Sequence, residues 1–253
     1  MHCARPHHSH SEADMSIVQV EGLRKVFGQG ELAVEALRDV SFSVEPGELM
    51  ALLGPSGSGK STLLLCISLI QEPSSGRITM NGQKIFDNGW TGIDVRRFRR
   101  ENIGFIFQAH NLIPFLNARD NIAIAMEING VHWKAARKRA LELLDYLDLS
   151  QRASSLPAIL SGGEQQRVAI GRALANSPSI IFADEPTASL DTVRGTKVME
   201  LLKRIAGEQQ TAVITVTHDI RMIEGFDTIY HIVDGRLVVD DTAPISASHT
   251  SKD

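Results

Sequence analysis

The stretch Gly54-Pro55-Ser56-Gly57-Ser58-Gly59-Lys60-Ser61 decides the fold of this 253-residue chain. It fits the pattern G-x-x-x-x-G-K-[ST], with an apolar run before it and a helical pattern after it. Glycines in such a loop let successive backbone N–H groups face phosphate oxygens, and the following helix adds its positive end. The amine of Lys60 suits β- and γ-phosphates, and the hydroxyl of Ser61 suits Mg²⁺. The sequence therefore predicts a nucleotide phosphate site.

A second candidate half of this site follows the apolar run 180–183, which ends in Asp184 and Glu185. Asp184 is expected to hold hydrated Mg²⁺, and Glu185 to polarise the attacking water as a general base. Paired acids after an apolar strand are commonly only a strand end or a helix cap. The lysine loop in the same chain favours the catalytic interpretation.

The segment Leu160-Ser161-Gly162-Gly163-Glu164-Gln165-Gln166-Arg167 predicts another exposed helix N-terminus. It is a second candidate phosphate-binding end in a chain whose first is already assigned. If the two ends lie far apart in the fold, one nucleotide cannot use both, and two chains would each offer this end to the other's ATP. The alternative is an ordinary Ser N-cap with a capping-box acid at Glu164.

Apolar runs alternate with helical patterns through most of the chain. Strands are expected over 48–53, 103–107, 179–183 and 212–216, and helices over 135–149, over 193–205 and after the lysine loop, there with Leu63, Leu64, Ile67 and Leu69. This alternation predicts an α/β fold with a mainly parallel sheet. Residues 16–44 alternate apolar and polar positions, which predicts an antiparallel β layer, and a helical subdomain is expected over about 112–165.

The helical patterns also predict which side chains face inward. The helix over 135–149 is expected to bury Ala140, Leu141, Leu144 and Leu147. The helix over 193–205 is expected to bury Val198, Leu201, Leu202 and Ile205.

Composition excludes several classes of protein. Lys plus Arg is 26 and Asp plus Glu is 30, a net charge of −4 that argues against a nucleic-acid binder. The two cysteines, Cys3 and Cys66, offer no disulfide framework and fit a reducing cytosol. The most apolar stretch, 63–70, is far shorter than the ~18 residues of a membrane span, so a membrane role would need another chain.

The chain ends carry their own expectations. Residues 1–14 are expected to be a disordered leader before a start at Met15, and 242–253 a flexible tail, which leaves one nucleotide-binding domain over 15–241. The leader contains His2, His7, His8 and His10, for which a metal-binding tract is the alternative.

Further motifs stand in a familiar order. Gln108 follows the run 103–107, Ser189-Leu190-Asp191 follows the acids, and His218 follows the run 212–217. Together with the segments above, they resemble the ABC-type ATPases, the nucleotide-binding subunits of ABC transporters, over about residues 17–239. The resemblance implies a P-loop NTPase core, ATP and Mg²⁺ as ligands, ATP hydrolysis, and a homodimer that binds no nucleic acid.

The resemblance also implies a role for each site residue. The catalytic residues would be Lys60, Gln108, Glu185 and His218, and the Mg²⁺ ligands Ser61, Gln108 and Asp184. Nucleotide contacts would come from Phe27, Gly54, Ser56, Gly57, Ser58, Gly59, Lys60, Ser61 and Thr62, and across the dimer from Ser161, Gly162, Gly163 and Asp191. Phe27 would stack on adenine, with a core Phe in a strand as the alternative.

Two positions depart from the commonest family spelling. Glu164 stands where Gln is commoner, and Ala188-Ser189-Leu190-Asp191 replaces the commoner Ser-Ala-Leu-Asp. Neither departure removes a catalytic group, so an active enzyme is expected.

Segments 34–42, 107–114, 160–174 and 183–191 resemble the lipoprotein-release, macrolide-efflux and heterocyst-glycolipid-export branch. This implies a separate integral-membrane permease at the cytoplasmic face of the inner membrane, exporting or extruding a lipid, lipoprotein or peptide, with a periplasmic adaptor as a further candidate partner. The permease is expected near Gln108 and 109–116; the alternative is that Leu112, Ile113, Phe115 and Leu116 pack inside the helical subdomain. The alternative function is an ATP-driven mechanical regulator of an envelope or cell-division complex that transports nothing.

Overall fold

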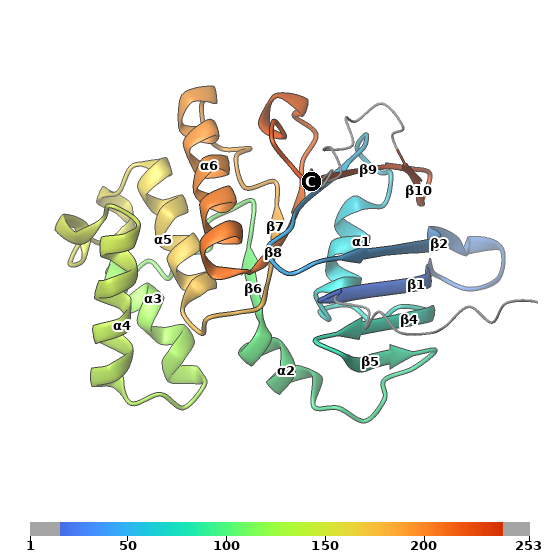
Figure 1. The fold of residues 1–253 in the computed structure, drawn as a ribbon, viewed down its shortest axis with the longest axis horizontal. Coiled ribbons are helices and arrows are strands. Elements are labelled where there is room, and N and C mark those ends of the chain that lie inside the picture. The colour runs from blue at the N-terminus through green and yellow to red at the C-terminus, as the bar shows by residue number, and fades with distance from the viewer. Residues whose placement is uncertain (1–15, 240–253) are drawn as a thin grey trace, which may run out of the picture.

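A computed structural model describes residues 16–239 (Figure 1). The expectations for the leader, its histidines, the start at Met15 and the tail lie outside the described residues.

A six-stranded sheet forms the centre of the molecule. Its order is β10 (Arg236–Val239), β9 (Thr228–Val233), β3 (Leu49–Leu53), β8 (Ala212–Val216), β7 (Ile180–Asp184) and β6 (Ile103–Ile106). All pairings are parallel except that of β10 with β9. The mainly parallel α/β core is therefore confirmed.

A four-stranded antiparallel sheet packs beside it. Its order is β2 (Val34–Val44), β1 (Val18–Phe27), β4 (Ser75–Met80) and β5 (Gln83–Asp87). The N-terminal β layer is confirmed, and it also includes two strands that follow the lysine loop in sequence.

The helices divide between two regions of Figure 1. They are α1 (Lys60–Ile67), α2 (Val95–Asn102), α3 (Ala118–Ile128), α4 (Trp133–Tyr146), α5 (Gly162–Leu174) and α6 (Thr192–Gln209), with short 3₁₀ turns at Gly30–Leu32, Ser150–Arg152, Pro157–Ile159 and Ile220–Met222. Helix α1 packs between the two sheets, whereas α3, α4 and α5 gather beyond α6 on the far side of the central sheet.

The two faces of the central sheet bury two hydrophobic clusters. Side chains alternate across a strand, and β7 sends Ile180 and Phe182 toward α1 and the antiparallel sheet, but Ile181 and Ala183 toward the helical side. This burial on both faces is the reason that the central strands read as unbroken apolar runs.

Two helical expectations need correction. Leu69 lies beyond the end of α1 in a left-handed turn (φ 61°), although it is buried. On α4, Leu141 is 46% exposed and Leu143 is buried in its place. Ala140, Leu143, Leu144 and Leu147 share one face at helical spacing, and Leu141 is about 100° away from Ala140. The inward residues of α6 are all buried as expected.

Strand β6 approaches α5 so closely that a side chain cannot fit between them. A methyl group on Gly104 would lie 2.7 Å from the carbonyl oxygen of Ala173. Gly104→Ala should therefore lower the free energy of unfolding by about 1–3 kcal/mol, as overpacking does. Gly207→Ala on α6, with nothing within 4 Å, should raise it by about 0.5–1 kcal/mol. Urea unfolding measures both, and equal stability of the two variants would contradict the packing described.

Candidate nucleotide site

The lysine loop joins β3 to α1, and only glycine fits its last turn. Gly59 has φ 106°, and a methyl group there would lie 2.6 Å from the carbonyl oxygen of Ala36. Lys60 begins α1, is 8% exposed, and donates through Nζ to the carbonyls of Gly54 (2.7 Å) and Pro55 (2.8 Å). Because an ammonium has three donors, one remains for an incoming phosphate.

The two acids stand at the end of β7 in different environments. Burial, with the charge of Glu185 as a second cause, raises the pKa of Asp184 against the opposing charge of Lys60. Glu185 has φ 48°, a conformation that costs a non-glycine residue about 1–2 kcal/mol. Its backbone N–H donates to the carbonyl of Val216 at 2.9 Å, which holds this strained turn. Such strain is typical of residues held for function.

His218, which follows β8, contacts Glu185 directly. Its Nδ1 lies 2.8 Å from Oε1 of the carboxylate, and the imidazole remains 68% exposed. The sequence did not predict this contact, because it pairs residues 33 positions apart. The open side of the ring leaves it free to meet a ligand.

The phosphate cavity, of about 410 Å³, brings most of the expected residues together. Its lining consists of Ala36, Ser56, Gly57, Gly59, Lys60, Ser61, Thr62, Gln108, Asp184, Glu185 and His218. Gly54 and Ser58 stand behind it: the first holds Lys60, and the second is buried and accepts the Gly235 N–H through its carbonyl at 2.9 Å. Ala36, from β2, was not expected, since no sequence signal marks it.

Phe27 lies outside that lining, at the end of β1. It is 40% exposed, so it is not a core residue, and the amine of Lys25 lies 5.1 Å from its ring centroid. Its contact with adenine stays a prediction.

The donors in the cavity fit a magnesium ion. Ser61, Gln108 and Asp184 offer hydroxyl, amide and carboxylate oxygens, which are the ligand types that Mg²⁺ accepts. A cation would also favour the charged form of Asp184, whose pKa is raised by burial first and by the charge of Glu185 second. Within residues 16–239, no group of three or more His, Cys, Asp or Glu side chains is arranged to hold a metal by itself. The three oxygen donors Ser61, Gln108 and Asp184 leave part of an octahedral Mg²⁺ coordination open for phosphate oxygens and water.

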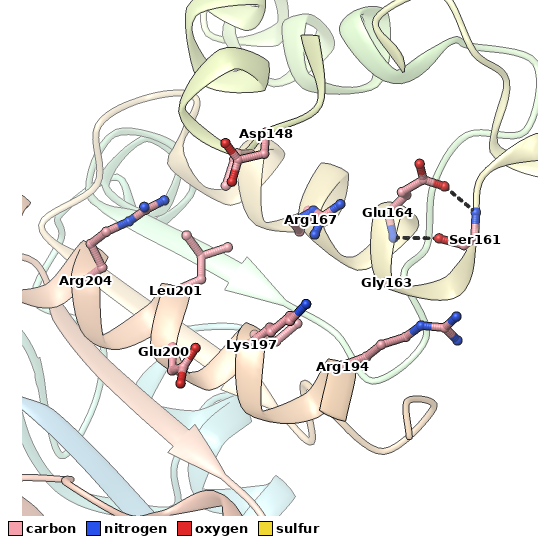
Figure 2. Close-up of a pocket in the computed structure, with 12 residues that line it drawn as sticks. Asp148, Ser161, Gly163, Glu164, Arg167, Arg194, Lys197, Glu200, Leu201 and Arg204 are labelled. Carbon is pink, nitrogen blue, oxygen red and sulfur yellow. Dashed lines mark hydrogen bonds between the residues drawn. The ribbon is translucent and has the colours of Figure 1, made fainter. Parts of the chain in front are cut away.

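The N-terminus of α5 lies in a different cavity, of about 540 Å³, between α5 and α6 (Figure 2). Ser161 caps the helix: its Oγ accepts the N–H of Glu164 at 3.4 Å, and its own N–H donates to Oε2 of Glu164 at 2.8 Å. The expected capping box is thus present. Ser161 and Gly163 line this cavity and neither lines the phosphate cavity, so one chain holds apart the two helix ends that the sequence predicts to bind phosphate.

Residues 188–191, here called the D-loop, pack beside this helix end. A methyl group on Gly162 would lie 3.6 Å from Leu190, and one on Gly163 would lie 3.6 Å from Arg194. Asp191 caps α6 by accepting the N–H of Arg194 at 2.9 Å, and its side chain stays 54% exposed. Residues 188–191 are not among the residues that line the phosphate cavity of the same chain.

The segment 109–116 is held by one buried amide that sequence reasoning missed. Asn121 accepts the N–H of Ile113 at 2.7 Å and donates to the carbonyl of Leu116 at 2.7 Å. Leu112 packs against the core, as the packed alternative expected, but Phe115 is 79% exposed. Asn121 stood in a helical pattern, and no sequence signal set it apart.

The unusual Glu164 has a charged neighbour. Its Oε1 lies 2.8 Å from Nε of Arg152. The Ser161 N–H first, and Arg152 among the weaker causes, lower the pKa of the Glu164 carboxyl. The ionised carboxylate is therefore the form that the helix end uses.

Glu164→Gln should lower stability at neutral pH and not in acid. A depressed pKa contributes stability above the ordinary carboxyl pKa and loses it as the pH falls through the lowered value. Because Gln keeps part of the cap, and solvent screens the exposed pair with Arg152, the loss at pH 7 should be about 0.5 kcal/mol. Urea unfolding at pH 7 and in acid measures it, with Glu200→Gln from the same cavity as the control. A loss independent of pH would contradict this assignment.

Comparison with known proteins agrees with this geometry. The ABC transporter family profile matches residues 37–188. An uncharacterized ABC transporter ATP-binding protein of Thermotoga maritima is 42% identical over 87% of this chain and 93% of its own length. The lipoprotein-releasing system ATP-binding protein LolD of Hyphomonas neptunium is 41% identical over 88% and 96%.

Solved structures give the same answer. The ATP-binding cassette MJ0796, in a dimeric post-hydrolysis state bound to ADP and Pi, matches with a TM-score of 0.77 at 39% identity over 87% of this chain and 96% of that one. The cbiO1 protein of Clostridium perfringens, part of the ABC transporter complex cbiONQ, matches with a TM-score of 0.79 at 28% identity over 89% and 88%. Within residues 16–239, no helix is long and apolar enough to cross a membrane. The chain belongs to the ABC transporter family and is an ATP-binding cassette ATPase.

Proposed function

We propose that two copies of the chain bind two ATP molecules head to tail, each nucleotide lying between the lysine loop of one copy and residues 160–164 of the other. The observation that carries this proposal is the separation of the two phosphate-binding ends into different cavities of one chain. In a head-to-tail pair, the lysine loop of one copy and the N-terminus of α5 of the other copy can bind the same nucleotide. The dimeric state described for MJ0796 supports it.

Most residues of the phosphate cavity, together with Phe27 beside it, have a proposed part in binding. Lys60 and the loop N–H groups of residues 56–62 bind the β- and γ-phosphates, and the exposed ring of Phe27 stacks on adenine. Ser61, Gln108 and Asp184 would hold Mg²⁺, which when bound neutralises phosphate charge. From the second copy, Ser161, Gly162 and Gly163 meet the γ-phosphate and Asp191 crosses the interface.

Hydrolysis needs a base beside the attacking water, and Glu185 is the proposed base. It takes a proton from the water as the oxygen attacks the γ-phosphorus and the bond to the β–γ bridging oxygen breaks, which yields ADP and phosphate. His218 hydrogen-bonds the γ-phosphate and, through its contact with Glu185, orients the carboxylate. Lys60 stabilises the charge on the transferred group.

We further propose that this cycle powers an integral-membrane permease in an export or extrusion system for a lipid, lipoprotein or peptide. The chain would then sit at the cytoplasmic face of the membrane through its permease, with a periplasmic adaptor in some assemblies. Two relatives support transport, because LolD is named for a lipoprotein-releasing system and cbiO1 is part of a transporter complex. No observation favours the mechanical regulator.

Glu185→Gln tests the general base. The variant should bind ATP with unchanged affinity but hydrolyse it about 10²–10⁴-fold more slowly, because the amide cannot accept the proton. With ATP trapped, it should sediment as a dimer. Glu224→Gln, an exposed acid outside the cavity, is the control. Normal turnover by Glu185→Gln would contradict the assignment of Glu185 as the general base. A monomeric Glu185→Gln protein at saturating ATP would contradict the proposed dimer.

Phe115→Ser tests the permease contact. The exposed ring is the apolar group that segment 109–116 offers to a docking partner. Tagged Glu185→Gln protein, trapped with ATP and purified from membranes of its native cell in mild detergent, should retain an integral-membrane protein that the added Phe115→Ser change removes. Ile128→Ser, which removes another exposed apolar side chain from α3, is the control. Equal recovery with Phe115→Ser would place the contact elsewhere.

A further inference from the structure

His110 lies where three segments of the chain meet. Its Nε2 is 3.5 Å from the hydroxyl oxygen of Ser189 in the D-loop, and its side chain neighbours that of Gln165 on α5. Gln165 is itself fixed, because its amide nitrogen donates to the carbonyls of Pro157 (3.1 Å) and Leu160 (3.0 Å). One imidazole thus joins the loop that follows Gln108, the D-loop and the helix that begins at residue 162.

The backbone around this imidazole is also anchored to α5. Arg172 donates to the carbonyls of Asn111 (2.5 Å) and His110 (2.9 Å). A neutral imidazole has one N–H and one lone pair. Such a ring can donate a hydrogen bond to the side chain of Gln165 through one nitrogen. Its other nitrogen can accept a hydrogen bond from the hydroxyl group of Ser189.

Ser189 is the position at which the D-loop departs from the commoner residue order. The commoner order has Ala here and Ser one residue earlier, so the hydroxyl of this chain stands at the position that faces His110. The D-loop is tied to the active-site turn at its start, because the Ala188 N–H donates to the Glu185 carbonyl at 3.1 Å. At its end, Asp191 caps α6. Ser189 therefore sits between the proposed base and the residue expected at the dimer interface.

We propose that His110 is a positioning residue that holds the D-loop through Ser189, so that a displacement of the Gln108 segment moves the D-loop facing the second copy. The inference rests on the head-to-tail dimer proposed above and deepens it. Segment 109–116, which includes His110, is also the proposed permease contact. A movement of the permease against this segment would therefore shift the D-loop at the nucleotide site of the second copy through one side-chain contact.

Removing the Ser189 hydroxyl separates this role from nucleotide binding. Neither His110 nor Ser189 lines the phosphate cavity, so Ser189→Ala should leave the Kd for ATP of the isolated subunit unchanged. It should lower kcat about three- to tenfold, the size of one lost hydrogen bond, and reduce the Hill coefficient for ATP. Ser189→Thr, which keeps the hydroxyl, and Ala188→Ser, which adds one at the neighbouring position, should keep wild-type values.

A double-mutant cycle completes the test. If the two side chains act on each other, His110→Ala with Ser189→Ala should lose no more activity than the worse single variant. If the losses of activity of the two single variants multiply in the double variant, or if Ser189→Ala keeps the wild-type kcat and Hill coefficient, the proposed link is overturned. The proposed function would still stand in that case, provided that the wild-type protein forms an active dimer. Should His110→Ala fail to fold, hydrogen exchange in Ser189→Ala decides: faster exchange at 108–111 is expected, and unchanged exchange overturns the link. A wild-type protein that neither dimerises nor hydrolyses ATP would instead fail the proposed function.

Discussion

The parallel register of β3, β8 and β7 is the constraint on which the rest of the site depends. These strands end at one edge of the sheet, and Val216 pairs with both Leu52 and Asp184. The lysine loop, Glu185 and His218 therefore emerge together, although they are distant in sequence. A slip of one residue between two strands would turn every side chain of the moved strand to the other face, which would separate the base from the loop.

The two departures from the commonest family spelling each have a neighbour within the chain. Glu164 keeps its helix cap as a carboxylate and lies against Arg152, and Ser189 meets His110. The residues of both contacts lie outside the lining of the phosphate cavity. The half-site that we propose for a second copy therefore has side-chain contacts of its own.

Where the expected chemistry requires one residue type, sequence reasoning selected residues that the structure mostly brings together. The lysine loop, the acids after β7 and the cap at Ser161 follow from local pattern, because a phosphate, a cation and a helix end each restrict the residues nearby. It missed Ala36, the His218–Glu185 contact and the His110–Ser189 contact, since each depends on how distant segments pack. It also predicted wrongly that Leu141 is buried, because the buried face of α4 is selected by tertiary contacts that the local pattern does not contain.

The central claim is that each nucleotide site is shared between two copies, and mixing two disabled proteins tests it most directly. Lys60→Ala removes the phosphate-binding amine from the lysine loop of one protein. Gly163→Asp blocks phosphate binding at the N-terminus of α5 in the other protein. Shared sites predict that the mixture recovers ATPase activity, up to about a quarter of wild type, because half of randomly formed pairs carry one intact site. A mixture as inactive as its separate components would mean that each site lies within one chain.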